Sequence, residues 1–156
     1  MKIFISSDHA GFALRAKVVR HLTDGGQAVV DIGPSSPDPL DYPDEAMKVG
    51  RLVRRDSEDR GILVCGSGVG VCMAANKVHG VRAVDAWNLE SARLSRAHND
   101  ANVLCLGERL IPDAEALRIV DLWLATPFEG GRHAGRVAKL TRIETEEAAP
   151  SSAAGQ

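Results

Sequence analysis

Residues 61–70 read GILVCGSGVG, and this stretch sets the expected fold class. Its first half, Gly61–Cys65, is a short apolar run with the length and composition of a buried strand. Its second half, Gly66–Gly70, is a glycine-rich turn that leads into a segment with helical spacing, Val69–Val78. A buried strand, a tight turn and a helix begin a strand–helix–strand unit, so we expect an α/β fold.

The same alternation continues on both sides of this stretch. Short apolar runs predict strands at Lys2–Ser7, Gln27–Ile32, Gly61–Cys65, Val81–Asp85 and Asn102–Gly107. Longer amphipathic segments predict helices at Ala10–Asp24, Pro43–Arg55, Val69–Val78, Leu89–Ala97 and Asp113–Ala125. Strand–helix repetition implies parallel pairing with right-handed crossovers. The pattern therefore predicts a single-domain α/β protein with a three-layer, doubly wound (Rossmann-like) parallel sheet of five strands.

Length and charge restrict the domain count and the classes of partner. The 156 residues suit one domain, which we place at 1–145, followed by a flexible tail of small residues at 146–156. A formal net charge of −2 gives no basic field that would attract nucleic acid or anionic lipid. No apolar run approaches the roughly 20 residues that cross a bilayer, and the first residues enter a strand rather than a secretory leader. We expect a cytoplasmic protein with neither a nucleic-acid nor a membrane partner.

The three cysteines do not suggest a disulfide framework or a zinc site. Cys65, Cys72 and Cys105 are odd in number and widely spaced, and no C-x-x-C motif is present. No group of carboxylates and histidines shows the sequence spacing of metal ligands. The sequence therefore predicts neither a metal nor another cofactor.

The Gly66–Gly70 loop is expected to bind an anion. A glycine turn between a strand and a helix directs several backbone N–H groups and the positive end of the helix at one point. The loop is not a P-loop, and its third glycine comes one residue too early for the dinucleotide motif G-x-G-x-x-G. A plain tight turn would also account for the glycines, although not for the reactive side chains beside them.

Those side chains follow two of the predicted strands. Cys65 ends its strand at the mouth of the loop, where amide dipoles favour a thiolate, although a small buried hydrophobe is the alternative. The Ser67 hydroxyl can transfer protons or cap the next helix. Asp8 and His9 follow the first strand and should face the same crevice as Cys65, unless they only cap the first helix.

Two further polar runs are candidates for the same site. His98, Asn99 and Asp100 offer three groups that donate or accept protons, and we group this end of the fourth helix with the strand-end loops. A solvated helix end is the alternative. Arg132 and Arg136 lie four residues apart and would share one face of a helix, where two guanidinium groups suit a phosphate. The alternative for this pair is a solvated basic face.

Seven strings of residues carry a wider pattern: SDHAGF at 7–12, DYP at 41–43, CGSGVG at 65–70, AANK at 74–77, GVRA at 80–83, HNDANVL at 98–104 and EGGRH at 129–133. Together they resemble the ribose-5-phosphate isomerase B and galactose-6-phosphate isomerase family, in order, over about residues 2 to 143. The resemblance implies a metal-free aldose–ketose isomerase that acts on a phosphorylated sugar.

The resemblance also implies a mechanism based on a thiol. Cys65 would move the proton between C2 and C1, and Ser67, where the family commonly has threonine, keeps the hydroxyl group. Some family members lack the cysteine and use a glutamate on the following helix, but this helix carries Val69, Val71 and Met73. The enediolate would be held by the backbone amides of Gly66, Gly68, Val69 and Gly70.

Binding of the sugar and the phosphate is implied in the same way. His98 and Asp8 would open the furanose ring, and Asn99 would bind sugar hydroxyls. The phosphate would be held by His9, Arg109, Arg132 and Arg136. Pocket depth around Asp41, Tyr42 and the Trp87-Asn88 loop would set the length of the sugar, so tetrose and hexose phosphates stay open as substrates.

The resemblance further implies a homodimer, with a dimer of dimers as a larger form. In the family, the neighbouring subunit contributes the His98 run to the pocket that holds the cysteine. A non-catalytic module that binds a phosphosugar or nucleotide is the alternative from another class. Such a module would need the glycine loop and the arginines but no acid–base set.

Overall fold

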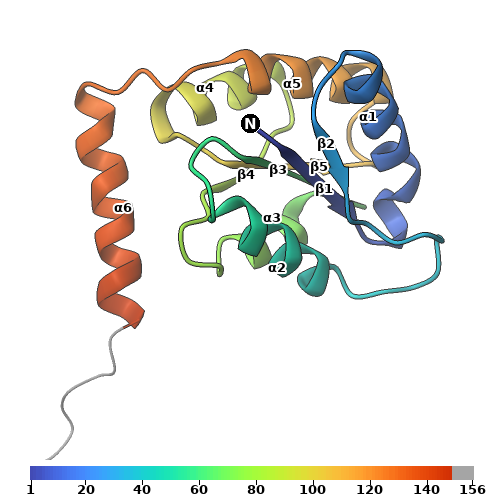
Figure 1. Ribbon diagram of the computed structural model, residues 1–156, viewed down its shortest axis with the longest axis horizontal. Coiled ribbons are helices and arrows are strands. Elements are labelled where there is room, and N and C mark those ends of the chain that lie inside the picture. The colour runs from blue at the N-terminus through green and yellow to red at the C-terminus, as the bar shows by residue number, and fades with distance from the viewer. Residues whose placement is uncertain (149–156) are drawn as a thin grey trace, which may run out of the picture.

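Five parallel strands form the sheet of the computed structural model, which describes residues 1–148 (Figure 1). They are β1 (Ile3–Ser7), β2 (Val29–Asp31), β3 (Arg60–Cys65), β4 (Ala83–Asp85) and β5 (Val103–Gly107). Their order across the sheet is β2-β1-β3-β5-β4, and every neighbouring pair is parallel. The prediction of a five-stranded parallel sheet is confirmed, and its edge strands β2 and β4 are shorter than predicted.

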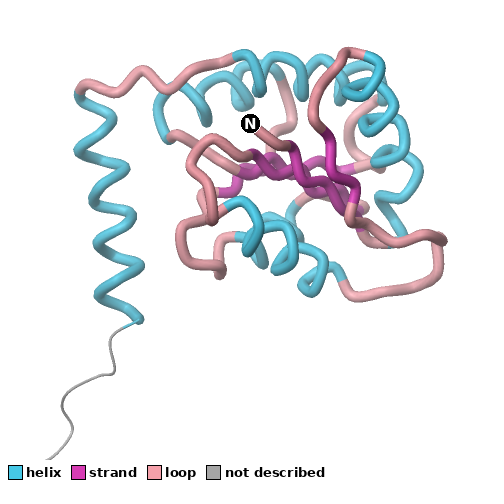
Figure 2. The backbone as a smooth tube through the Cα atoms, in the orientation of Figure 1, coloured by secondary structure: helices cyan, strands magenta, loops and turns pink. Residues whose placement is uncertain are grey.

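Helices cover both faces of this sheet, as Figure 2 shows. One face carries α1 (Phe12–Asp24), which follows a 3₁₀ turn at His9–Gly11, together with α4 (Leu89–Asn99) and α5 (Asp113–Ala125). The other face carries α2 (Tyr42–Val53) and α3 (Val69–Ala75). The predicted three-layer arrangement is confirmed.

The pleat of β3 divides its side chains between the two hydrophobic cores. Ile62 and Val64 pack into the core beneath α1, α4 and α5, which includes the fully buried Trp123. Leu63 and Cys65 pack into the core beneath α2 and α3. Successive side chains of a strand point to opposite faces, so an uninterrupted apolar run is what a strand buried on both faces requires.

A sixth helix, α6 (Arg132–Ala148), stands beside the rest of the molecule in Figure 1. The sequence indicates helical structure here only around Arg132 and Arg136. Of the α6 residues only His133 is buried, while Leu140 and Ile143 are exposed. Within the described residues the helix extends to Ala148, so residues 146–148, expected to begin the tail, are helical. The remainder of the expected tail, 149–156, lies outside the described residues.

Two glycines allow the loops at the carboxyl edge of the sheet to approach one another closely. A Cβ atom on Gly11 would lie 2.5 Å from the Val64 backbone, and a Cβ atom on Gly107 would lie 2.5 Å from the Ser67 backbone. Real Cβ atoms do not approach a backbone so closely, so any side chain there would push the loops apart. Within residues 1–148, no helix is both long and apolar enough to cross a bilayer.

Candidate active site

A crevice is expected where the strand order reverses, between the carboxyl ends of β1 and β3. Backbone hydrogen bonds join the loops that follow β1, β3 and β5 at this edge. The Asp8 N–H donates to the Val64 carbonyl oxygen at 3.2 Å, and the Arg109 N–H donates to the Gly66 carbonyl oxygen at 3.0 Å. These bonds fix the three loops relative to one another.

Cys65 is the last residue of β3, and its sulfur lies at the start of the glycine loop. The Gly68 N–H donates to Cys65 Sγ at 3.1 Å. Gly68 adopts a left-handed conformation with φ of 83°, which a residue with a side chain adopts only with strain. This conformation turns the Gly68 amide back toward the sulfur, so one amide of the loop contacts the thiol.

The Ser67 and Asp8 side chains make local hydrogen bonds. Ser67 Oγ accepts from the Val69 N–H at 3.3 Å. Asp8 Oδ1 accepts from the Ala10 and Gly11 N–H groups at 2.9 and 3.0 Å, so this carboxylate caps the 3₁₀ turn. Asp8 Oδ1 therefore has the capping role that was the alternative to a catalytic one. The other carboxylate oxygen of Asp8 takes no part in the cap.

Larger polar side chains surround the same loop. A Cβ atom on Gly70 would lie 2.8 Å from Tyr42 Cζ, and a Cβ atom on Gly66 would lie 3.1 Å from Arg109 Nη1. The tyrosine ring and the guanidinium group therefore lie directly against the loop. The predicted site residues that the structure places at this edge are Asp8, His9, Tyr42, Cys65, Gly66, Ser67, Gly68, Val69, Gly70 and Arg109.

Asp85 is a residue at this edge that the sequence analysis missed. It ends β4, and its Oδ1 would lie 2.1 Å from a Cβ atom on Gly68. Burial raises the pKa of the Asp85 carboxyl, and the neighbouring Trp87 side chain partly opposes that rise. The carboxylate lies behind the glycine loop and limits that position to glycine. A carboxylate that ends a strand is the sequence signal that could have identified it.

The His98 run does not lie at this edge, which corrects its grouping with the strand-end loops. Helix α4 starts beside the carboxyl end of β4 and runs back, so its last residues reach the amino ends of the strands. There, Arg82 Nε donates to the Asn99 carbonyl oxygen at 3.2 Å, and the Gly61 N–H donates to the Asn102 carbonyl oxygen at 2.9 Å. Within one chain, His98 and Cys65 therefore face opposite ends of the sheet.

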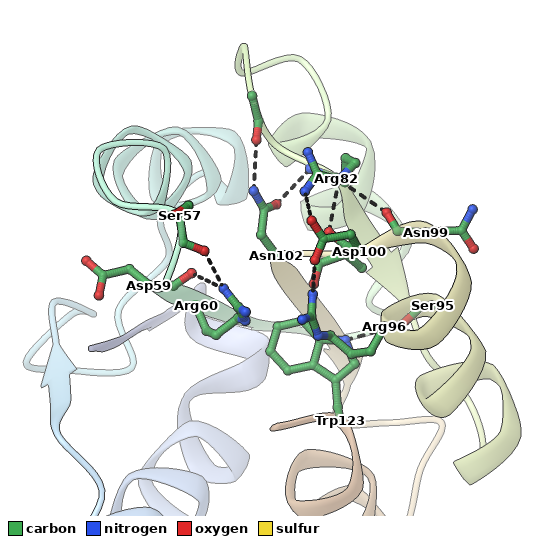
Figure 3. Close-up of polar contacts among 12 residues, drawn as sticks. Ser57, Asp59, Arg60, Arg82, Ser95, Arg96, Asn99, Asp100, Asn102 and Trp123 are labelled. Carbon is green, nitrogen blue, oxygen red and sulfur yellow. Dashed lines mark hydrogen bonds and ion pairs between the residues drawn. The ribbon is translucent and has the colours of Figure 1, made fainter. Parts of the chain in front are cut away.

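An arginine network holds the end of α4 in place, as Figure 3 shows. Asp100 has a left-handed backbone with φ of 48°, and its carboxylate accepts from Arg96 at 2.9 Å and from Arg82 at 2.8 Å. The buried Arg96 guanidinium also lies 5.8 Å from the centre of the Trp123 ring. Asp100, the third residue of the His98 run, thus holds the end of α4, with His98 and Asn99, in place through these contacts.

Helix α6 brings the two predicted arginines to this opposite edge. The Glu129 N–H donates to the Ala97 carbonyl oxygen at 3.0 Å, which ties the start of α6 to the end of α4. Arg132 and Arg136 lie one turn apart in α6, as the conditional prediction requires. The structure therefore separates the predicted site residues into one group near Cys65 and a second group formed by His98, Asn99, Arg132 and Arg136.

The same edge holds a cluster that the sequence analysis did not predict. One potential ligand atom from each of His98, Glu129 and His133 lies within 4.8 Å of the other two. The three residues come from two separate segments of the chain, so the expectation that no metal is needed stays a prediction. The Glu129 and His133 spacing of four residues was visible, but the contribution of His98 depends on the packing of α6 against α4.

The fold and the glycine loop define an α/β class of proteins in which ligands bind at the carboxyl ends of parallel strands. The family model described as Ribose/Galactose Isomerase matches residues 3–140, and the chain therefore belongs to that family. The family expected from the sequence strings is confirmed.

Individual relatives match over nearly their whole length. Ribose-5-phosphate isomerase B of Escherichia coli (strain K12) is 47% identical over 143 residues, which are 92% of this chain and 96% of that protein. The structure of ribose-5-phosphate isomerase B from Clostridium thermocellum has a TM-score of 0.92 at 47% identity, covering 95% of this chain and 100% of that one. The protein from Mycoplasma genitalium, solved with bound ribulose-5-phosphate, has a TM-score of 0.90 at 49% identity, covering 93% and 97%.

Proposed function

We propose that this chain interconverts ribose 5-phosphate and ribulose 5-phosphate. The observation that carries the proposal is the Cys65 sulfur, which accepts the Gly68 amide at 3.1 Å where the anion-binding loop begins. A thiol next to directed amides combines a base with donors for a developing oxyanion, the two requirements of aldose–ketose isomerisation. The relatives named ribose-5-phosphate isomerase B support this substrate, as does the sugar phosphate bound in the Mycoplasma genitalium protein.

The reaction would proceed by proton transfer through an enediolate. The Cys65 thiolate removes the proton from C2 of the open-chain aldose, and the electron pair of that C–H bond forms the C1–C2 double bond. The negative charge then lies on O1, which the amides of the glycine loop stabilise. The O2 proton passes to O1 through the Ser67 hydroxyl, and the thiol returns its proton to C1, which gives the ketose.

We infer that each complete site takes residues from two copies of the chain. Gly61 pairs with Val103 at the amino edge and Cys65 pairs with Gly107 at the carboxyl edge, a separation of about 13 Å along the strands. A general acid must come within about 3 Å of its substrate atom. His98 therefore cannot serve the Cys65 of its own chain, and His98 of the partner subunit would.

Exposed apolar side chains near both groups of predicted site residues support this homodimer. Met73 and Trp87 are exposed around the carboxyl edge, and Leu140 and Ile143 are exposed on α6. A groove of about 650 Å³ between α6 and the segment before β4 is lined partly by these two α6 residues and lies away from Cys65. Pairing of two copies would cover such surface and complete two sites by symmetry.

In such a dimer the predicted roles fall to both chains. Asp8 and the partner's His98 would open the furanose ring, and the partner's Asn99 would bind sugar hydroxyls. The phosphate would lie between His9 and Arg109 of one chain and Arg132 and Arg136 of the other. The three cysteines are free thiols, and thiols stay reduced in the cytoplasm, so we propose a cytoplasmic location.

Dialysis of the purified protein against a chelator should leave the conversion of ribose 5-phosphate to ribulose 5-phosphate unchanged. The proposed chemistry uses a thiol, amides and side-chain acids, so no step needs a metal ion. The initial rate before and after dialysis measures this. A loss of rate that one divalent ion restores would contradict metal-free catalysis. Absence of turnover with four-, five- and six-carbon aldose phosphates would instead favour the alternative of a non-catalytic module that binds a phosphosugar or nucleotide.

Replacing Arg136 with alanine should raise KM for ribose 5-phosphate about 10- to 150-fold, because a charged contact to phosphate is lost. The slow rate on unphosphorylated ribose should not change. Arg142→Ala is the matched control, since Arg142 is also exposed on α6 but pairs with Glu146 at 3.4 Å. Equal losses on both sugars would point to a folding defect instead of a phosphate contact.

A further inference from the structure

Three potential metal ligands converge where α4 ends and α6 begins. The Glu129 carboxylate oxygen Oε2 lies 3.6 Å from His98 Nε2 and 3.8 Å from His133 Nε2. The two imidazole rings are stacked with centroids 4.1 Å apart and planes inclined by 8°. Both ring nitrogens therefore face the same carboxylate oxygen.

The backbone holds these three side chains in place. The Glu129 N–H is bonded to the Ala97 carbonyl oxygen, one residue before His98. Gly130 and Gly131 both have left-handed φ values, of 64° and 52°, and this turn brings the chain back so that His133 lies beside Glu129. The His133 side chain is 7% exposed, whereas Glu129 is 52% exposed, so the cluster is anchored on one side and open on the other.

We propose that His98, Glu129 and His133 form a binding site for a divalent transition metal ion of the zinc type. Two imidazole nitrogens and one carboxylate oxygen are a ligand set that zinc accepts, with a fourth position left for water or another ligand. Bonds of about 2.0–2.1 Å in a tetrahedron place ligand atoms about 3.3 Å apart. The observed distances to Glu129 need to shorten by only a few tenths of an ångström. The two histidine nitrogens lie within 4.8 Å of each other and must come closer, so the stacked rings must tilt toward the metal.

The charges around the cluster favour a metal in part and oppose it in part. The Glu129 carboxylate supplies negative charge that favours a cation, and each histidine would coordinate the metal through its neutral imidazole. The positive charges of Arg132 and Arg136 disfavour a cation, so we expect weaker binding than at a structural zinc site.

A metal ion at this site would inhibit the isomerase. This consequence rests on the proposed function, in which His98 opens the sugar ring, because a coordinated imidazole nitrogen can no longer exchange a proton. The metal is therefore an inhibitory ligand and has no part in the chemical steps. The binding itself depends only on the three side chains and can be measured without a sugar phosphate.

The test is a calorimetric titration of the purified full-length protein with zinc chloride. Four proteins are compared: wild type, Glu129→Gln, His133→Gln and His21→Gln. His21 is the matched control, since its Nε2 also lies near a carboxylate, 2.7 Å from Asp121 Oδ1, but residues 1–148 place no third ligand beside this pair. Wild type and His21→Gln should bind one zinc ion per chain, with binding at least about tenfold weaker in the other two variants.

Two results would overturn the proposal. One is a wild-type protein that binds no zinc, and the other is equal affinity in all four proteins, as expected if zinc binds the Cys65 thiolate. Glu129 is exposed, so Glu129→Gln tests the site even if the buried His133→Gln change prevents folding. Initial rates should then show zinc inhibition of the wild type that a chelator reverses and that Glu129→Gln weakens by the same factor.

Discussion

Cys65→Ser should lower kcat by about 10²–10⁴ and leave KM close to its wild-type value. General acid–base catalysis contributes on this scale, and a serine hydroxyl cannot hold the negative charge that a thiol accepts near neutral pH. The contact between base and substrate proton develops only in the transition state, so ground-state binding should not change. Steady-state kinetics with ribose 5-phosphate measure both constants.

The matched control is Cys72→Ser. Cys72 lies on α3 in the same core but one turn into the helix, away from the mouth of the loop. Its replacement should leave kcat within a few-fold of wild type. If Cys65→Ser turned over at a near-normal rate while remaining folded, the base would have to be another group, and the proposed mechanism would fail.

Most of the fold could be predicted because its signals are local. Helix α5 has the predicted bounds, Asp113–Ala125, since its apolar spacing and the Thr126-Pro127 stop lie within a single stretch of sequence. The central strands β1, β3 and β5 were identifiable because a strand buried on both faces must be continuously apolar. The carboxyl-edge group around Cys65 followed from the same pattern, since parallel strands place their following loops at one edge.

Helix α6 could not be predicted in full because it buries almost nothing in its own chain. Its apolar residues Leu140 and Ile143 are exposed, so they make no contact with the core that would identify the helix as part of the domain. The partner subunit proposed above would supply the missing contact. The same reason explains why the cluster of His98, Glu129 and His133 was missed, since it forms only when α6 packs on α4.

The position of His98 is a different case, because the edge of the sheet at which it lies could have been predicted from the sequence. A helix that follows one parallel strand and leads into the next must run back along the sheet, so its last residue lies at the amino edge. His98 was grouped with the strand-end loops on the basis of its chemistry alone. The direction of α4 corrects this placement, and the correction makes the shared site a geometric requirement of the proposed roles.

Co-refolding Cys65→Ala and His98→Ala chains, each inactive alone, should restore roughly a quarter of the wild-type activity. With random pairing about half of the dimers are mixed. If each site combines Cys65 of one chain with His98 of the other, a mixed dimer has one site with both lesions and one with neither. One intact site in two, in half of the dimers, gives the expected fraction.

The opposite arrangement predicts a different result from the same experiment. If one chain supplied both residues, every site in a mixed dimer would keep one lesion and no activity would return. Formation of mixed dimers must be shown separately, for example with a charge tag on one chain and native mass spectrometry. A mixture that contains mixed dimers and stays inactive would therefore rule out the shared site. Because the length of the strands separates His98 from Cys65 within one chain, we expect a quarter of the wild-type activity to return.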